Sequence, residues 1–517
     1  MNIELLWVLL KNQAITLVEG LCIIIEAKTA SKRSPIMTSS NPPEISPVKK
    51  PTRRIGMLTV FRLGLFNLAL GLMAVLTLAV LNRVMIDELA ISATITTGVL
   101  AVAQFVAPAR VFFGQLSDTK PLWGTHRTGY VRLGAIVFST IIFFVVQVVW
   151  QLGAVVVTNG GWVLNSQTLG WSAILALMMA VYGMAVSSSS TPFTALLVDI
   201  TDEQERSKLV AVVWSMLMVG IVIGGITGKV LLGKIEPNEL GQIPLESLQQ
   251  PINSIFAFIP LVIIAFAFIA TWRIEKRYSR FSALSSSSDR EDRMTLKKSL
   301  QIITSSRQTG VFFLFLCLFT LALFMQEGVL EPYGGEVFGM SIGDTTLLNS
   351  YWGMGILLGY GVTGFAVIPR LGKKPTTKLG CLCVALSFGL IILSGFTQNE
   401  TILKAAIFIF GIAAGVATIG GISLMLDLTA TETAGTFIGA WGLAQAMSRA
   451  LATVIGGVIL DVGKALFSVP MLAYGSVFAI QAVTMLVAIA ILGSVNIQEF
   501  QTTTKKAIAT VMEGDLD

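Results

Sequence analysis

Long apolar runs recur along this chain from residue 55 onward, and one of them, GVFFLFLCLFTLALF at 310–324, contains no charged residue. A helix needs roughly 20 predominantly apolar residues to cross the hydrocarbon core of a bilayer. Hydrophobic residues make up 54% of the 517 positions and charged residues only 13%. A soluble protein of this length could not bury so much apolar surface, so lipid must solvate most of the chain. The sequence predicts an all-α integral membrane protein.

Twelve of these runs are long enough to be transmembrane helices, and they fall into two groups of six. We expect spans at 61–82, 93–116, 129–152, 169–192, 205–232, 252–272, 309–331, 346–369, 376–396, 402–426, 433–460 and 470–493. The groups form an N-terminal bundle at 55–272 and a C-terminal bundle at 309–495, joined by a polar, basic linker at 273–308. Residues 1–54 form an N-terminal extension with a polar, disordered tail, in which Met37 is a candidate for the true start, and 496–517 form a second tail.

Lysine and arginine residues gather in alternate loops, which sets the predicted orientation. They precede span 1, follow span 12, and occur between spans 2 and 3, between spans 8 and 9 and in the linker. The opposite loops, such as TNGGWVLNSQT, are nearly free of them. Because cytoplasmic loops carry the excess of positive charge, both termini and the linker are predicted to be cytoplasmic. The same rule explains the net charge of +6 without a nucleic-acid partner.

The two groups of spans also resemble each other. Asp199 follows span 4 as Asp427 follows span 10, and both are candidates for gating contacts between the bundles. Glu327 and Glu331, here called the acidic pair, close span 7 where LNRVMIDEL closes span 1. A duplicated six-helix unit with a cytoplasmic linker is typical of the major facilitator architecture, whose halves meet around a site at the membrane midplane.

The loop after span 2, FGQLSDTKPLWGTHR at 113–127, is similar to the Gly-x-x-x-Asp…Gly…Arg motif of that superfamily. Gly114 is expected to allow a close helix approach, while Asp118 and Arg127 are expected to pair across the bundle interface and hold one state closed. An ordinary tight loop with positive charges on the cytoplasmic side explains the same residues. The matching loop at 365–380 keeps the basic residues but lacks the aspartate.

Gly220, Gly224 and Gly228 recur at every fourth position of GIVIGGITG in span 5. Small residues with this spacing let two helix backbones touch, so we expect them to pack helices together. The run resembles the antiporter motif of the superfamily's fifth span. It lacks that motif's proline, and antiport is not inferred from it.

Three arginines lie in or beside apolar spans, where a charge is costly unless it faces a cavity or a partner. Arg83 precedes Asp87 by four residues, so the two could pair along a helix. Snorkelling of Arg83 to the outer surface is an equal alternative. Arg110 lies nearer the inner end of span 2, as a helix anchor or a site residue. Arg449 lies in the middle of span 11 and is expected to find an acidic or polar partner across the central cavity.

The acidic pair, Glu327 and Glu331, lies one turn apart on one predicted helix face, and Pro332, Tyr333 and two glycines follow. Pro332 is expected to end the helix, since proline disfavours the α conformation of the residue before it. One interpretation is a solvated helix end. The others are a proton relay, an ion pair with Arg83, or oxygen ligands for a metal centre, since hard cations such as magnesium take oxygen ligands.

Other chemistry is disfavoured by what the sequence lacks. With His126 as its single histidine, the chain is a poor candidate for histidine-ligated metals, for haem and for a Ser-His-Asp mechanism. It contains no G-x-x-x-x-G-K-[ST] run. The four cysteines lie mostly in apolar runs, as small core residues do. We predict neither an enzymatic activity nor a bound metal ion.

Several segments resemble one family, the PucC/LhaA-like bacteriochlorophyll delivery branch of the major facilitator superfamily. They are RLGLFNLALG (62–71), LNRVMIDEL (81–89), FGQLSD…HRTGY (113–130), LLVDITDEQERSKLVAVVWSMLMVGI (196–221) and LEPYGGEVFGMSIGDTT (330–346). The last two are the most specific. The resemblance implies a photosynthetic membrane, either a thylakoid or a bacterial inner membrane, and a non-covalently bound chlorophyll or bacteriochlorophyll.

The resemblance further implies an assembly factor that delivers this pigment to antenna or photosystem apoproteins, with pigment-synthesis enzymes as further candidate partners. The candidate residues for pigment, substrate or coupling are Arg83, Asp87, Arg110, Glu327, Glu331, Tyr333 and Arg449. The residues leave an alternative open, a proton- or ion-coupled secondary transporter of a small solute. A scaffold that only contacts partner helices is a third.

Overall fold

The computed structural model describes residues 55–201, 203–233, 235, 245–279, 307–428 and 434–496. Almost all of these residues are helical, and within these ranges the isolated β-bridge joins Leu122 to Thr125. The predicted extension at 1–54, the linker from 280 to 306 and the tail from 497 lie outside the described residues.

The first half of the chain folds into long helices with short non-α turns. Its elements are α2 (Met57–Arg83), the π-helical turn η1 (Val84–Glu88), α3 (Ala93–Phe105), α4 (Ala109–Thr119), α5 (Thr128–Thr158), α6 (Ser166–Ile200), α7 (Glu203–Leu232), α8 (Leu245–Thr271) and α9 (Ile274–Tyr278). Polar side chains cap the first turns of α3 and α6. The Asn165 side chain, for example, accepts hydrogen bonds from two backbone N–H groups in the first turn of α6.

The second half repeats this plan. Its elements are α12 (Arg307–Phe324), the 3₁₀ turn η2 (Met325–Gly328), α13 (Leu330–Phe338), α14 (Ile342–Val362), the π-helical turn η3 (Thr363–Val367), α15 (Ile368–Leu371), α16 (Lys373–Thr397), α17 (Glu400–Leu428), α18 (Ala434–Leu466) and α19 (Pro470–Ser494). In both halves the first long helix is followed by a non-α turn, η1 after α2 and η2 after α12.

Eleven helical segments in the described part of the chain are long and apolar enough to cross a membrane. They match the predicted spans except span 8. That span corresponds to α14, which continues through η3 into α15 but carries the polar residues Asp344 and Asn349. The predicted all-α membrane fold is confirmed, with a helix count close to the predicted twelve.

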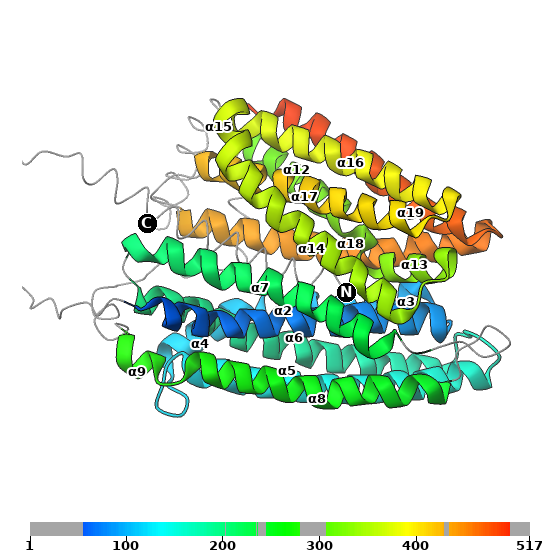
Figure 1. Ribbon diagram of the computed structural model, residues 1–517, viewed down its shortest axis with the longest axis horizontal. Coiled ribbons are helices and arrows are strands. Elements are labelled where there is room, and N and C mark those ends of the chain that lie inside the picture. The colour runs from blue at the N-terminus through cyan, green and yellow to red at the C-terminus, as the bar shows by residue number, and fades with distance from the viewer. Residues whose placement is uncertain are drawn as a thin grey trace, which may run out of the picture.

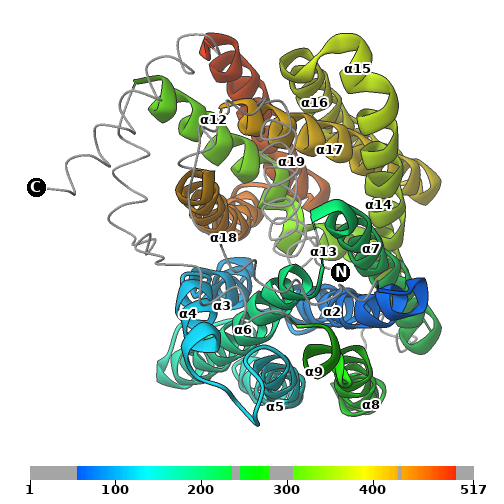
Figure 2. The same cartoon turned by 90° about the vertical axis from the view of Figure 1, so that its left-hand side faces the viewer.

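The two halves lie side by side along the long axis of the molecule (Figure 1). Viewed end-on, the helices of the first half, blue to green, lie on one side and those of the second half on the other (Figure 2). The most extensive contacts between the halves are those of α7 with α14 and of α3 with α18.

Glycines bring α7 close to its neighbours. A Cβ on Gly220 would lie 2.1 Å from the carbonyl oxygen of Leu68 on α2, and Gly224 faces α2 as well. A Cβ on Gly228 would lie 2.4 Å from Thr346 Cγ2 on α14. The three glycines therefore stand at helix contacts, but the contacted helix changes from α2 to α14 along their length.

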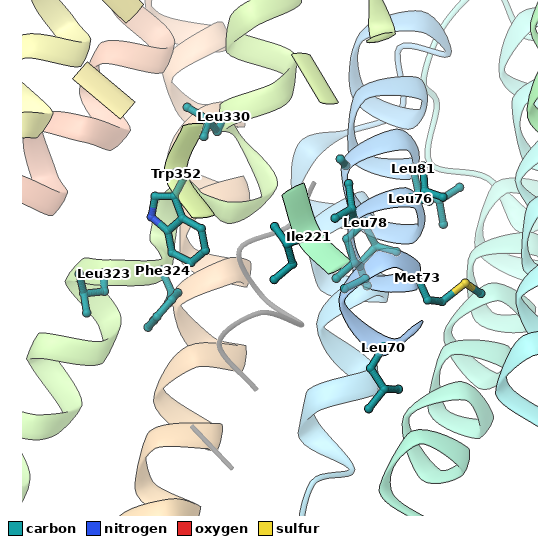
Figure 3. Close-up of a cluster of buried hydrophobic side chains, with 14 of the residues drawn as sticks. Leu70, Met73, Leu76, Leu78, Leu81, Ile221, Leu323, Phe324, Leu330 and Trp352 are labelled. Carbon is teal, nitrogen blue, oxygen red and sulfur yellow. The ribbon is translucent and has the colours of Figure 1, made fainter. Parts of the chain in front are cut away.

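Buried apolar side chains line helices of both halves in this region (Figure 3). Leu70 and Leu78 on α2, Ile221 on α7, and Phe324 and Trp352 in the second half are each at most 2% exposed. We call these five residues the apolar seam. Lipid tails are as apolar as these side chains, so close packing, not the exclusion of water, holds the seam together.

Candidate functional site

The acidic pair lies at a break within the seventh span. α12 ends at Phe324, η2 covers Met325–Gly328, and α13 begins at Leu330. Pro332 stands in the first turn of α13, where a missing backbone N–H costs no intrahelical hydrogen bond. The prediction that Pro332 ends a helix is therefore wrong, because this proline lies at the start of the next one.

Glu327 and Arg449 form an ion pair inside the second half. Arg449 Nη2 lies 2.7 Å from Glu327 Oε1, and Nε lies 3.2 Å from Oε2, so the guanidinium engages both carboxylate oxygens. Both side chains are 0% exposed, and the guanidinium carbon lies 4.7 Å from the centre of the Phe324 ring. Arg449 thus has an acidic partner, but the partner comes from its own half and not from across the central cavity.

Glu331 has a different partner because the backbone turns between the two acids. Its Oε1 accepts a hydrogen bond from Asn349 Nδ2 at 3.1 Å, and the Glu331 side chain is fully buried. Asn349 Nδ2 also donates to the carbonyl oxygen of Thr346 at 3.3 Å. Both members of the acidic pair are buried and face different helices, so a solvated helix end and a shared helix face are both wrong.

Arg83, at the end of α2, is 6% exposed, so it does not snorkel to the surface. It forms ion pairs with Asp87 and, at 3.1 Å, with Glu88, and its Nη2 donates to the carbonyl oxygen of Met340 at 3.3 Å. A Cβ on Gly335 would lie 2.1 Å from the guanidinium carbon, so a side chain there would displace Arg83. The carboxylates that hold Arg83 are its own neighbours, and an ion pair with the acidic pair is wrong.

The breaks in the first and seventh spans nevertheless face each other. Asn82 Nδ2, at the end of α2, donates to the carbonyl oxygen of Glu327 in η2 at 3.0 Å. The π turn η1 follows directly after α2. Such π turns are frequent at functional sites. The two halves therefore meet here through an amide, not through an acid and a base.

Tyr333 is buried in an aromatic cluster. Its ring centre lies 5.0 to 5.6 Å from those of Phe338, Tyr474 and Phe478. Its hydroxyl donates to the carbonyl oxygen of Ile391 at 2.8 Å. The side chain therefore packs α13 against α16 and α19.

Arg110 lies in the first turn of α4, directly after the break between α3 and α4. Its side chain is partly buried.

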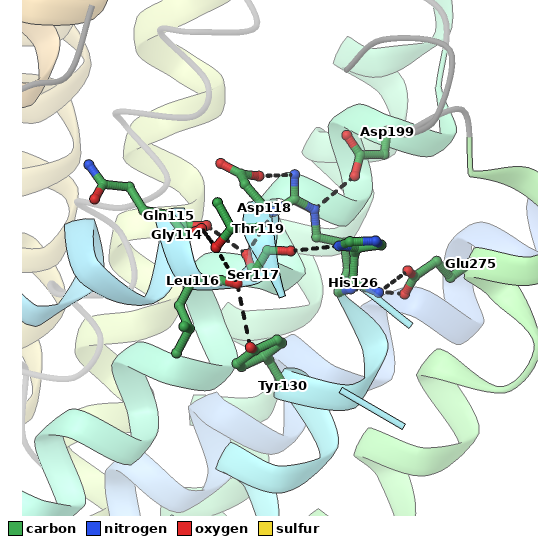
Figure 4. Close-up of polar contacts among 11 residues, drawn as sticks. Gly114, Gln115, Leu116, Ser117, Asp118, Thr119, His126, Tyr130, Asp199 and Glu275 are labelled. Carbon is green, nitrogen blue, oxygen red and sulfur yellow. Dashed lines mark hydrogen bonds and ion pairs between the residues drawn. The ribbon is translucent and has the colours of Figure 1, made fainter. Parts of the chain in front are cut away.

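A second polar cluster lies at the predicted cytoplasmic end of the first half (Figure 4). Arg127 Nη2 lies 2.6 Å from Asp118, and its Nε donates to Asp199 Oδ2 at 2.9 Å. Its Nη1 donates to Ser117 Oγ at 2.7 Å, and the residue is 5% exposed. Asp118 and Arg127 do pair, but the predicted pairing across the bundle interface is wrong. The cluster instead ties α4, α5 and α6 of one half together.

Other predictions for this loop also change. Arg127 is buried and paired with two carboxylates, which an ordinary solvated loop would not require. A Cβ on Gly114 would meet Thr191 Cγ2 at an ordinary 3.5 Å, so the expected close approach is not needed. Asp427 lies in α17, but its side chain falls outside the described residues.

One polar contact between the halves was not expected from the sequence. Asp461 on α18 accepts hydrogen bonds from Ser92 Oγ at 2.6 Å, from Ala93 N at 2.9 Å and from Thr94 N at 2.8 Å. Its carboxylate therefore caps the N terminus of α3, where a negative charge is favourable. The signal was an acid inside the apolar run GGVILDVGKAL, but nothing local indicates that a helix of the other half would receive it.

A sequence model of a protein family, described as PUCC protein, matches residues 80–500. The chain belongs to the PUCC protein family. The bacteriochlorophyll synthase 44.5 kDa chain of Rhodobacter capsulatus is 30% identical over 442 residues, which cover 84% of this chain and 94% of that one. Protein PucC of Rhodobacter capsulatus is 27% identical over 439 residues, which cover 83% and 90%.

The fold of this PUCC-family chain is that of the major facilitator transporters. The crystal structure of the nucleoside transporter NupG matches 85% of this chain and 99% of its own, with a TM-score of 0.60 at 12% identity. A likeness at this identity shows the fold alone.

Two buried amide oxygens lie beside the acidic pair of this PUCC-family chain. The described residues contain no group of three or more His, Cys, Asp or Glu side chains that could hold a metal ion. The Oδ1 atoms of Asn82 and Asn349 are buried and accept no hydrogen bond in the described part of the chain. A buried acceptor without a donor costs free energy, so these two oxygens require an explanation.

Proposed function

We propose that this PUCC-family protein is a membrane assembly factor that binds chlorophyll or bacteriochlorophyll and delivers it to antenna or photosystem apoproteins. Family membership supports this proposal, since one relative is named as a bacteriochlorophyll synthase chain. On this proposal the protein works in a thylakoid or bacterial inner membrane with both termini cytoplasmic. Apoproteins and pigment-synthesis enzymes are its partners, and it moves the pigment without catalysing a reaction on it.

The orphaned oxygen of Asn349 carries the proposal. Asn349 Nδ2 is held by Glu331 Oε1 at 3.1 Å and by the Thr346 carbonyl at 3.3 Å, which fixes the direction of Oδ1. Magnesium prefers oxygen ligands, and the magnesium of a chlorophyll accepts one axial ligand. Glu331 thereby gains a role as a positioning residue for Asn349. Asn82, held by the Glu327 carbonyl at 3.0 Å, offers an equivalent oxygen from the first half.

Access to these oxygens requires the halves to move. Asn82 and Asn349 are both 0% exposed, so a pigment reaches them only when the contacts between α2, α13 and α14 open. The apolar seam would then become an apolar surface against which a macrocycle and its hydrocarbon tail pack. Alternating exposure of this kind is the ordinary motion of the major facilitator fold.

Accumulation of antenna complexes in a strain that lacks this protein tests the proposal. Asn349→Leu removes the oxygen at nearly constant volume and is expected to abolish rescue of the strain. Asn349→His supplies another magnesium ligand and is expected to restore at least part of it. The matched control is Asn159→Leu, the same change at an exposed asparagine that directly follows α5. Full rescue by Asn349→Leu would refute the ligand role.

The Glu327–Arg449 pair favours a second candidate, a proton- or ion-coupled transporter of a small solute. An ionised pair at 0% exposure inside a membrane protein is costly and commonly marks a proton or ion path. Arg83, Glu327 and Glu331 would then be the coupling residues. Pigment-free protein that accumulates a solute in vesicles in response to a pH gradient would favour this candidate over pigment delivery.

A further inference from the structure

A basic cavity of about 870 Å³ lies at the end of the first half, where α8 passes into α9. α2, α5, α8 and α9 lie together at this end of the molecule (Figure 2). The charged residues that line the cavity are five cations, Arg62, Arg132, Arg273, Lys276 and Arg277, and one acid, Glu275. This end is the predicted cytoplasmic one.

The single acid of the cavity is already engaged. The Glu275 carboxylate accepts hydrogen bonds from the backbone N–H groups of His126, Arg127 and Thr128, at 2.5, 3.0 and 2.7 Å. These groups begin α5, where the helix dipole favours a negative charge. Glu275 therefore mainly neutralises a helix terminus, and the cations of the cavity remain in excess.

Two of the cations are fixed in place by the end of α8. Arg62 Nη2 donates to the carbonyl oxygen of Trp272 at 3.0 Å. Arg132 Nε donates to Thr271 Oγ1 at 2.9 Å, and its Nη2 donates to the Thr271 carbonyl at 3.1 Å. The Arg132 guanidinium also lies 5.1 Å from the centre of the Phe268 ring. Both guanidinium groups are thus pre-organised at the cavity wall.

No carboxylate in the described part of the chain forms an ion pair with any of the five cations. The excess of positive charge on cytoplasmic loops explains why such residues lie at this end. It does not explain why five of them converge on one cavity, where their mutual repulsion is unfavourable unless an anion is bound.

We propose that this cavity binds a phosphate group, and that a lipid of the adjacent leaflet carries it. Arginine forks match the geometry of phosphate oxygens and bind them through charge-assisted hydrogen bonds. Trp272 lines the cavity and is 57% exposed. Exposed tryptophans concentrate at the level of lipid headgroups, so the cavity mouth lies where a lipid phosphate would be. The site is independent of whether the protein carries pigment.

The test uses the full chain in a neutral detergent and measures its melting temperature with added phosphatidylglycerol, phosphatidylcholine or inorganic phosphate. Lys276→Gln/Arg277→Gln removes two exposed cations of the cavity and spares the arginines bonded to α8. The control is Lys120→Gln/Arg370→Gln, which removes two exposed cations that do not line the cavity.

Phosphatidylglycerol is expected to raise the melting temperature of the wild type more than phosphatidylcholine does. The cavity variant should need about tenfold or more phosphatidylglycerol for the same shift, whereas the control variant should respond as the wild type does. If inorganic phosphate stabilises the wild type and the control but not the cavity variant, the cavity is a phosphate site whose ligand is soluble and not a lipid. Equal responses of the cavity variant and the control to every additive would overturn the proposal.

Discussion

Glu327 and Arg449 form a two-point ion pair, with Nη2–Oε1 at 2.7 Å, although neither side chain has any exposed surface. The pair joins the break between α12 and α13 to the middle of α18. Removing two ions from water is expensive, and only good geometry offsets this cost. An apolar replacement could hold two helices together as well. The presence of a charged pair here therefore points to function, or to a need for one specific arrangement.

The first prediction concerns this pair. Glu327→Gln or Arg449→Met alone leaves one buried charge without its partner and should destabilise the protein by about 3–5 kcal/mol. The double variant removes both charges and should recover most of this loss. Melting temperatures of the purified variants in detergent measure the effect. If the loss of stability in the double variant equals the sum of the losses in the two single variants, the coupling energy between Glu327 and Arg449 is zero and the ion pair does not stabilise the protein.

The double variant also separates stability from function. If it folds but fails to restore antenna accumulation in a strain that lacks this protein, the charges themselves are needed. If it restores accumulation fully, the ion pair is a structural link between helices.

Gly335 provides a test of the contact between the halves. Its Cβ would lie 2.1 Å from the guanidinium carbon of Arg83, so Gly335→Ala should displace Arg83 and cost about 1–3 kcal/mol. Gly361→Ala is the control, because no atom lies within 4 Å of its Cβ position and alanine favours a helix. Thermal unfolding should show a loss for the first and no loss for the second. A melting temperature of Gly335→Ala that rises as much as that of Gly361→Ala would contradict the described position of Arg83.

Sequence reasoning located the spans well because length and apolarity alone decide which segments enter a bilayer. It failed where the outcome depends on distant partners. The local rule for Pro332 predicted a helix end, yet the same residue suits the first turn of a new helix once the chain breaks at Met325–Gly328. The local sequence alone does not decide whether Pro332 ends one helix or begins the next. That depends on how η2 packs against α18 and α19.

The partners of charged residues could likewise be predicted from the sequence when they are close along the chain, but not when they are distant. Arg83 and Asp87 are four residues apart, so their pairing could be predicted from helix geometry. Arg449 is separated by 122 positions from Glu327, and its partner could be predicted in type but not in identity. The Asp118–Arg127 pair was recognised from a loop motif, but its place inside one half depends on Asp199 at the end of α6.

The Asp461 contact predicts a coupling between helix capping and the closure of the two halves. Asp461→Asn keeps one capping oxygen but removes the negative charge at the N terminus of α3, and should destabilise the protein by about 0.3–1 kcal/mol. It should also expose Thr97 to solvent. Thr97 packs closely against Gly457, since a Cβ on Gly457 would lie 2.0 Å from Thr97 Oγ1. In a protein without its native cysteines, a cysteine introduced by Thr97→Cys should therefore react several-fold faster with a water-soluble maleimide when Asp461→Asn is also present.

Its control is Glu400→Gln, which removes a partly exposed carboxylate whose ion pair with Lys404 lies within α17. This change should leave the labelling rate as it was. A rate unaffected by Asp461→Asn would mean that the cap does not hold the halves together.

The Arg127 cluster predicts unequal roles for its two aspartates. Asp199 is 9% exposed and Asp118 is 44% exposed. Asp118→Asn should therefore cost about 0–1 kcal/mol, as for other exposed ion pairs, whereas Asp199→Asn should cost about 2–4 kcal/mol because the pair is mostly desolvated. Chemical or thermal unfolding measures both. The reverse order would show that burial does not govern this cluster.

The absorption spectrum of the full-length protein, purified from a host that makes chlorophyll, tests pigment binding most directly. The wild type should elute with a red chlorophyll band that Asn349→Leu loses and Asn349→His keeps, while Asn159→Leu behaves as the wild type. A wild-type protein without the band, or an Asn349→Leu variant with a band of equal height, would contradict the assignment of Asn349 as a pigment ligand.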